Sequence, residues 1–318
     1  MALLFYSFMG AGHLWIDELC RLDPSLEVRS LEGDESLSPE AIHDITYAVV
    51  WRPPHGLLAS LPHLKAVFSL GAGVDSIMAD PSLPDIPVVR SVSPDLTARM
   101  SEYVVLQTLY HHRRMTDYSA LKSLAKWRYL HQPAASEVRV GVLGLGVLGM
   151  DAARKLSMLG FQVAGWSRTP KSEPDIDCFT GDDEFPSFLA RTDILICLLP
   201  LTEATRGILN KDTFSRLPQD GAGRGPVIIN AARGGHQVEA DILAALNDGI
   251  LSGVSLDVFE EEPLPETSPL WQHERAVITP HVASISDPKS ICRIIIDNIR
   301  RSESGHPLEN VVDRTQGY

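Results

Sequence analysis

The chain has 318 residues and a formal net charge of −13 at pH 7. A chain of this length can form two domains of ordinary size, each with its own core. The acidic charge balance argues against nucleic acid and anionic membrane surfaces as partners, because both require basic patches on the protein. Apolar runs stay well short of the roughly 18 residues that a membrane span needs.

The apolar segment at residues 1–8 has no basic residues, so it predicts a first strand in place of a signal peptide. The four cysteines are scattered and form no C-x-x-C pair. This usage predicts reduced thiols in a cytoplasmic protein and indicates no metal site.

Short apolar runs alternate with polar or helical stretches in the first hundred residues. The runs occupy residues 3–7, 47–51, 66–70 and 86–89. This pattern predicts a small α/β domain with a parallel sheet. The loop at residues 69–77 has two glycines but carries Ser76 where a dinucleotide loop would have a third glycine. It fits a backbone nest for a small anion or a plain turn.

A helical stretch is expected at about residues 96–127, and a glycine-rich segment follows it. Residues 138–143 read as an apolar strand that leads into Gly144, Gly146 and Gly149. The pattern then predicts a helix at residues 150–159 and a second strand at residues 161–166. Such a βαβ unit suits a dinucleotide pyrophosphate, although a glycine turn without a ligand is the alternative.

The residues after the second strand bear on which dinucleotide binds. An acidic residue there accepts hydrogen bonds from the ribose of NAD, whereas arginine accommodates the 2′-phosphate of NADP. This chain has Ser167, Arg168 and Lys171 and no carboxylate in that stretch. We therefore expect NADP(H) to be preferred over NAD(H), the alternative being a basic loop that only contacts solvent.

Four more strands are expected at residues 193–198, 227–230, 253–258 and 276–279, with helices between them. A last helix at about residues 288–302 follows this second domain and is expected to return to the first. The predicted organisation is therefore α/β, with two Rossmann-like domains built on doubly wound parallel sheets. Residues 1–97 and 286–318 form a discontinuous substrate domain, and residues 98–285 form the inserted NAD(P)-binding domain.

Polar residues follow three of these strands, where open α/β sheets present their ligands. They are Arg233, the acidic pair Asp257 and Glu262, and His281. Each has an ordinary structural explanation on its own. Together they match the needs of 2-keto acid reduction: a cation for the carboxylate and carbonyl, an acid for the carbonyl oxygen, and a carboxylate that keeps that acid charged. We assign these roles to Arg233, His281 and Glu262 respectively.

These motifs resemble the D-2-hydroxyacid dehydrogenase family over essentially the full length of the chain. Within the family the chain looks most like the bacterial glyoxylate/hydroxypyruvate reductase A group. The resemblance is carried by segments 141–149, 166–168, 230–234, 256–259, 262–264, 268–273 and 279–281. It extends to segment 70–77 and to segments 312–314 and 317–318.

The resemblance implies the same catalytic roles for Arg233, Glu262 and His281, and a homodimer built largely on the nucleotide domains. It implies that backbone amides around Ala72 and Gly73 contribute, with Arg233 and His281, to binding the substrate. The residues expected at the cofactor are Gly144, Gly146, Val147, Leu148, Gly149, Ser167, Arg168, Lys171, Leu199, Pro200, Ala231, Asp257 and Ser284.

The roles of Trp127, Trp51 and Arg52 stay open at this point. By analogy Trp127 reaches across a dimer to the partner's active site, or it is a local packing residue. Trp51 and Arg52 lie before the substrate loop, and a packed aromatic beside a surface arginine is the safer interpretation.

The predicted activity is NADPH-dependent reduction of small 2-keto acids, glyoxylate to glycolate and hydroxypyruvate to glycerate. One alternative is an NAD-dependent enzyme similar to phosphoglycerate dehydrogenase. The other is a regulator that senses the dinucleotide without catalysis. Neither nucleic acid nor membrane is expected as a partner, and no metal is expected in the site.

Overall fold

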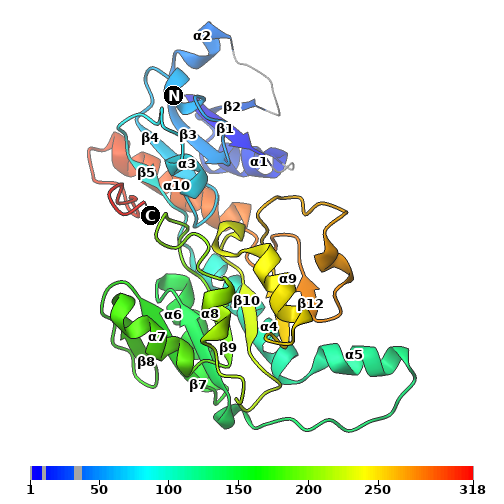
Figure 1. Cartoon of the computed structure of the whole chain (residues 1–318). Coiled ribbons are helices and arrows are strands. Elements are labelled where there is room, and N and C mark those ends of the chain that lie inside the picture. The colour runs from blue at the N-terminus through cyan, green and yellow to red at the C-terminus, as the bar shows by residue number, and fades with distance from the viewer. Residues whose placement is uncertain (1, 9–11, 32–37, 318) are drawn as a thin grey trace. The chain divides into compact units, whose positions relative to one another are not determined.

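A computed structural model describes residues 2–8, 12–31 and 38–317 (Figure 1). Contacts within the chain divide it into two compact units. Unit 1 comprises residues 1–96 and 286–318, and unit 2 comprises residues 97–285. Within the described residues, no helix is both long enough and apolar enough to cross a membrane.

Unit 1 contains a five-stranded parallel sheet within the described residues, in the order β2-β1-β3-β4-β5. Its strands are β1 (Ala2–Ser7), β2 (Glu27–Leu31), β3 (Ile45–Trp51), β4 (Ala66–Ser69) and β5 (Val88–Val89). Its helical elements are α1 (Gly12–Leu22), α2 (Pro39–Ile42), η1 (Leu58–Ser60), α3 (Asp75–Met78) and α10 (Pro288–Glu303).

Alternate residues of each central strand of unit 1 enter two different cores. In β3, Tyr47 and Val49 pack with the core that contains α1 and α10, whereas Ala48 and Val50 pack with the core on the opposite face. A strand covered on both faces must be apolar throughout. This explains why the strands of this unit read as continuous apolar runs in the sequence.

Unit 2 contains a seven-stranded parallel sheet, counted over the described residues, in the order β12-β11-β10-β9-β6-β7-β8. Its strands are β6 (Arg139–Leu143), β7 (Gln162–Ser167), β8 (Asp177–Thr180), β9 (Ile194–Cys197), β10 (Val227–Asn230), β11 (Gly253–Leu256) and β12 (Ala276–Ile278).

Helices cover both faces of this second sheet (Figure 1). Ile228 of β10 enters the core formed with α7, α8 and α9, and its neighbour Ile229 enters the core formed with α4 and α6. The helical elements are α4 (Pro94–His112), α5 (Met115–Ser123), η2 (Ala135–Glu137), α6 (Val147–Met158), α7 (Gly181–Ala190), α8 (Lys211–Ser215), η3 (Gly234–His236), α9 (Glu239–Asn247) and η4 (Pro269–Gln272).

The fold class predicted from the sequence, with two Rossmann-like parallel sheets, is confirmed. Each predicted strand overlaps an observed one. The sequence pattern predicts neither β2 nor β8, which lie at sheet edges. Both are largely half-exposed or exposed along their length. An edge strand of this kind lacks the continuous apolar run that identifies a buried one.

The helical stretch predicted at about residues 96–127 is largely helical, but it is not continuous and it ends at Ser123. The chain forms α4 and α5, and the helix breaks at Arg114, whose φ is +61°. A left-handed residue cannot continue a right-handed helix. The Arg114 guanidinium donates from Nε to Asp117 at 2.8 Å and from Nη1 to the His131 carbonyl at 3.1 Å. These bonds stabilise the break, and they depend on a segment well beyond it in the sequence.

Candidate active site

One edge of the unit 2 sheet collects most of the residues singled out from the sequence. Because all seven strands are parallel, the segments after β6, β7, β9, β10, β11 and β12 emerge at the same edge. The chain runs outward from β6 in one direction and from β9 in the other, so the strand order reverses between these two neighbours. Ligands of open α/β sheets bind at this reversal.

The three glycines after β6 have three different local environments. Gly144 has φ +99°, and a Cβ on it would lie 2.8 Å from the Leu198 carbonyl oxygen. A Cβ on Gly149 would lie 1.8 Å from the carbonyl oxygen of Gly144. Both positions therefore require glycine for the fold itself.

Gly146 differs, because a Cβ on it would have no neighbour within 4 Å. It is exposed and precedes α6, so the N–H groups of the first helical turn, from Val147 and Leu148 onward, begin beside open space. A bare backbone with space in front of it, at a helix N-terminus, fits a pyrophosphate. These residues fit a dinucleotide.

The loop after β7 is shaped by short-range bonds. The Ser167 hydroxyl donates to the Thr169 carbonyl at 2.8 Å. Further along, Arg154 of α6 forms two bonds of 2.6 and 2.8 Å to the carboxylate of Glu173. Between these anchors Arg168 and Lys171 are exposed. The segment presents two cations at the position where a dinucleotide 2′-phosphate is read.

His281 and Glu262, which lie 19 residues apart in the sequence, form a hydrogen-bonded pair. Nδ1 of His281 is 2.9 Å from Oε2 of Glu262, and the side chains are 24% and 14% exposed. The other carboxylate oxygen accepts the Phe259 N–H at 3.1 Å. Since an ionised carboxylate only accepts, Nδ1 carries the proton and Nε2 is the ring nitrogen that does not face Glu262.

The backbone of His281 is held in an uncommon conformation. Its φ is +55°, in the left-handed region that costs a residue with a side chain about 1–2 kcal/mol. Asp257 stabilises this segment: its carbonyl accepts the His281 N–H at 2.8 Å. Its carboxylate accepts the N–H groups of Val282 and Ala283 at 2.9 and 2.8 Å.

The carboxylate of Asp257 also accepts the Thr279 hydroxyl at 2.6 Å. Asp257 is 1% exposed, and burial raises the pKa of its carboxyl group. Hydrogen bonds from the loop replace the hydrogen bonds that water would make to this carboxylate if it were exposed. The sequence placed Asp257 at the cofactor, and that contact stays a prediction. The structure adds that its carboxylate anchors the loop of His281.

Arg233 follows β10, the strand next to β11. Its Nη1 donates to the Ala232 carbonyl at 2.7 Å. The next residue, Gly234, lies so close to the loop of Glu262 that a Cβ would be 1.8 Å from the Phe259 carbonyl oxygen. The loops of Arg233 and Glu262 are therefore packed backbone against backbone, and Gly234 is required for that contact.

Two buried residues beyond Arg233 were missed by the sequence reading. His236 is fully buried, with Nδ1 3.1 Å from the Arg233 carbonyl and Nε2 3.2 Å from the Pro200 carbonyl. Gln237 accepts from Asn230 at 2.8 Å and donates to the Val258 carbonyl at 3.0 Å. The sequence signal for these two residues is that they follow a pair of glycines directly. Polar residues after a glycine turn usually contact solvent, so this signal does not indicate burial.

The remaining residues expected at the nicotinamide half lie at this edge as well. Leu199 and Pro200 follow β9, Ala231 follows β10, and Ser284 follows β12 by six residues. Leu199 and Ala231 are buried, whereas Pro200 and Ser284 are half-buried. The contacts of these residues with a cofactor stay predictions.

Ala72 and Gly73 lie in unit 1, after β4. Ser69 shapes their loop: its hydroxyl donates to the Gly73 carbonyl at 3.0 Å and accepts the Gly71 N–H at 3.3 Å. A Cβ on Gly71 would lie 2.5 Å from the ring of Trp51. Trp51 is thus a packing residue of this loop, in line with the safer interpretation of the sequence.

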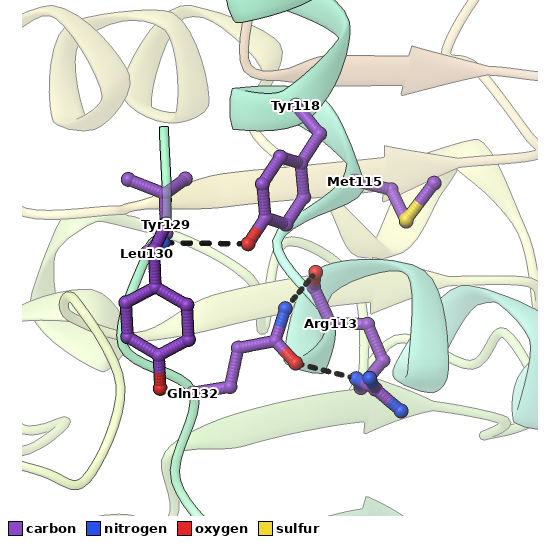
Figure 2. A pocket seen from close by; sticks show the side chains of 6 residues that line it. All are labelled: Arg113, Met115, Tyr118, Tyr129, Leu130 and Gln132. Carbon is purple, nitrogen blue, oxygen red and sulfur yellow. Dashed lines mark hydrogen bonds between the residues drawn. The ribbon is translucent and has the colours of Figure 1, made fainter. Parts of the chain in front are cut away.

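A separate pocket of about 550 Å³ lies around the start of α5 and the segment after it. Its lining includes Tyr118, whose hydroxyl accepts the Leu130 N–H at 3.4 Å, and Arg113, which is bonded twice to Gln132 (Figure 2). In Figure 1, α5 and this segment extend away from the unit 2 sheet. Trp127 is fully exposed there, which argues against local packing.

Across the described residues, no group of three or more histidine, cysteine, aspartate or glutamate side chains is arranged to hold a metal ion. The four cysteines, Cys20, Cys178, Cys197 and Cys292, are unpaired with one another.

A glycine turn that fits a pyrophosphate and a carboxylate-bonded imidazole share one edge of a doubly wound sheet. This combination is typical of dinucleotide-dependent oxidoreductases. The family described as D-isomer specific 2-hydroxyacid dehydrogenase, NAD binding domain, matches residues 105–283. The chain belongs to the D-isomer specific 2-hydroxyacid dehydrogenase family.

Full-length relatives support the same assignment. The chain is 41% identical to glyoxylate/hydroxypyruvate reductase A of Klebsiella pneumoniae (strain 342), over the whole of both chains. It is 44% identical, with a TM-score of 0.94, to an NADPH-dependent glyoxylate/hydroxypyruvate reductase from Sinorhizobium meliloti in complex with NADP and sulfate. That alignment covers 100% of this chain and 99% of the other.

A third relative carries a different acid ligand. It is a probable 2-hydroxyacid dehydrogenase from Rhizobium etli CFN 42 in complex with NADP, HEPES and L(+)-tartaric acid. It is 42% identical, with a TM-score of 0.91, and the alignment covers 100% of this chain and 99% of that one.

Proposed function

We propose that this protein reduces small 2-keto acids with NADPH, converting glyoxylate to glycolate and hydroxypyruvate to glycerate. The observation that carries the proposal is the 2.9 Å bond between His281 and Glu262, at the sheet edge that also holds the glycine turn. The names of the similar reductases support the choice of substrates.

Each catalytic residue has a role that follows from its chemistry. Arg233 binds the substrate carboxylate and polarises the carbonyl, because a guanidinium is permanently charged and offers paired donors. His281 gives a proton from Nε2 to the carbonyl oxygen. Glu262 accepts the Nδ1–H of His281, which fixes the tautomer and the orientation of the ring. NADPH, when bound, supplies the hydride that reduces the carbonyl carbon.

We assign cofactor binding to unit 2, through the glycine turn and the basic loop with Arg168 and Lys171. The two cations and the missing carboxylate favour NADP(H) over NAD(H). The relatives crystallised with NADP support this preference. We retain the backbone amides around Ala72 and Gly73 in unit 1 as proposed donors to the substrate carboxylate.

A spectrophotometric panel tests the function. Oxidation of NADPH and NADH is followed with glyoxylate, hydroxypyruvate, pyruvate and phosphohydroxypyruvate. We expect the highest kcat/KM with NADPH and either of the first two acids. A preference for NADH with phosphohydroxypyruvate would establish the phosphoglycerate dehydrogenase alternative. Tight NADPH binding without turnover of any acid would establish the regulatory alternative.

We also propose that the protein is a homodimer and that a second copy covers the segment around α5. Trp127 and Tyr129 are 105% and 85% exposed there, and Leu124 and Met115 add further exposed apolar surface. Apolar side chains gathered on one projecting segment are typical of an interface. Sedimentation analysis of Trp127→Ser should show a weakened dimer, and a monomeric wild type would contradict the proposal.

A further inference from the structure

A chain of hydrogen bonds runs from α4 to the segment that carries His281. The hydroxyls of Tyr103 and Thr279 are 2.8 Å apart, and the Thr279 hydroxyl donates to the Asp257 carboxylate at 2.6 Å. Asp257 in turn accepts the backbone N–H groups of Val282 and Ala283, which directly follow His281. The catalytic proposal above uses neither Tyr103 nor Thr279.

The direction of these bonds follows from counting hydrogens. The Thr279 hydroxyl has one hydrogen, and it goes to the carboxylate, so Tyr103 must be the donor in its bond with Thr279. Tyr103 is 8% exposed, and burial raises the pKa of its hydroxyl, which therefore keeps its proton. The Tyr103 hydroxyl therefore donates to the Thr279 oxygen, and the Thr279 hydroxyl donates to the Asp257 carboxylate.

The segment needs such an anchor for two reasons. His281 is in the left-handed conformation, which persists only where surrounding contacts impose it. In addition, the chain leaves unit 2 after Ile285, four residues beyond His281, and it entered unit 2 at Thr97, six residues before Tyr103. The Tyr103–Thr279 bond therefore ties the first segment of the unit to its last.

We propose that Thr279 and Tyr103 are positioning residues for His281: they fix the Asp257 carboxylate, which fixes the backbone of the loop and so the aim of the imidazole. This inference rests on the proposed function for its kinetic consequence. Its structural consequence, a loop held by two hydroxyls, can be measured without any activity.

Ser255 on β11 provides a matched control. The fully buried Ser255 hydroxyl donates to Gln107 of α4 at 2.8 Å and is 2.8 Å from Nε2 of His111. Tyr103, Gln107 and His111 are spaced four residues apart, so they share one face of α4. Ser255→Ala thus removes a buried hydroxyl that links α4 to the same sheet but leads to no catalytic group.

The kinetic experiment compares Thr279→Val, Thr279→Ser, Tyr103→Phe and Ser255→Ala. We expect Thr279→Val to lower kcat by about tenfold or more, because small displacements of a catalytic group are costly, with KM and NADPH affinity changed by less than about threefold. Thr279→Ser restores the hydroxyl and should recover most of kcat. Tyr103→Phe should lower kcat by a smaller factor, and Ser255→Ala should leave it within about twofold of wild type.

The double variant Tyr103→Phe/Thr279→Val should be no slower than Thr279→Val alone, since both hydroxyls act along one path. If the two single losses of kcat multiply in the double variant, the proposal is overturned. A Thr279→Val enzyme with wild-type kcat, or a loss in Ser255→Ala equal to that in Thr279→Val, would also overturn it.

Amide hydrogen exchange of residues 281–285 provides the readout that does not need turnover. Thr279→Val and Tyr103→Phe should speed exchange there, while Thr279→Ser and Ser255→Ala should not. Unchanged exchange in both of the first two variants would overturn the inference. If wild type reduces none of the tested acids yet the exchange pattern is as expected, the proposed function has failed and the anchoring of the loop stands. Should Thr279→Val not fold, Tyr103→Phe and Thr279→Ser carry the same test.

Discussion

Two histidines of unit 2, His281 and His111, are each bonded to one principal side-chain partner, yet their surroundings differ. His281 faces the Glu262 carboxylate and is 24% exposed at the carboxyl edge of the sheet. His111 lies near the end of α4 and faces the Ser255 hydroxyl. Burial lowers the pKa of His111 to about 4.

Under the proposed function, this difference separates a reactive histidine from a structural one. The carboxylate partner of His281 fixes the tautomer of its ring, and partial exposure leaves the ring accessible to a substrate. Burial in a core favours the uncharged ring of His111. The Ser255 hydrogen goes to Gln107, so the Nε2–H of this ring donates to the Ser255 oxygen. Four predictions test this contrast, from the largest expected effect to the smallest.

Replacement of His281 by alanine should have the largest effect. Loss of an acid–base group lowers kcat by about 10²-fold or more. NADPH affinity, measured by fluorescence titration, should stay near the wild-type value. The matched variant is His111→Gln, whose kcat should lie within about twofold of wild type. Equal losses in the two variants would remove the functional distinction between the two rings.

His111→Gln should instead change how stability depends on pH. In the unfolded wild type, His111 binds a proton once the pH falls below the ordinary pKa of histidine. In the folded protein the His111 ring stays uncharged down to about pH 4. Stability is therefore lost as pH falls, by about 2 kcal/mol between about pH 7 and about pH 5. The glutamine variant lacks this component, so its unfolding free energy should fall by that much less. Urea unfolding at both pH values measures the difference. The prediction is contradicted if both proteins lose the same unfolding free energy between the two pH values.

Glu262→Gln should lower kcat for reduction by about tenfold at neutral pH. A glutamine amide can turn its NH2 group toward Nδ1, so the tautomer and orientation of the His281 ring are no longer fixed. Glu261→Gln makes the same change of charge at an exposed neighbour and should leave kcat unchanged. A Glu262 variant with the kcat of wild type would take this residue out of the mechanism.

Ser255→Ala should have the smallest effect. It removes the buried partner of Gln107 and His111 and should cost about 1–2 kcal/mol of unfolding free energy. Thermal unfolding measures the loss, which should come without a change in kcat. A variant as stable as wild type would show that this connection between α4 and β11 contributes little.

The residue pattern predicted the buried strands of both sheets, and it supplied the residue types on which the proposed chemistry of the site rests. The buried strands read as apolar runs because both of their faces are covered, as Ile228 and Ile229 show. Gly144 and Gly149 are required by close approaches within a short stretch of chain, so their spacing already reports the turn. Arginine, glutamate and histidine after successive strands indicated 2-keto acid reduction before any contact was known.

Other features depend on residues that meet only after folding. The break at Arg114 is stabilised by a bond to the carbonyl of His131, and edge strands β2 and β8 lack the apolar run of a buried strand. Tyr103 and Thr279 are 176 residues apart, and each alone reads as an ordinary core or turn residue.

The sequence by itself therefore determined the fold class and the residue types available for reduction, because periodicity and glycine spacing are local properties of the chain. The pairing of Glu262 with His281 was expected from the residue types, and the structure adds its geometry, a distance of 2.9 Å. Only the tertiary structure decided that Asp257 holds the segment that follows His281. A hydrogen bond is set by the distance and direction between two atoms, and these exist only once distant strands lie side by side.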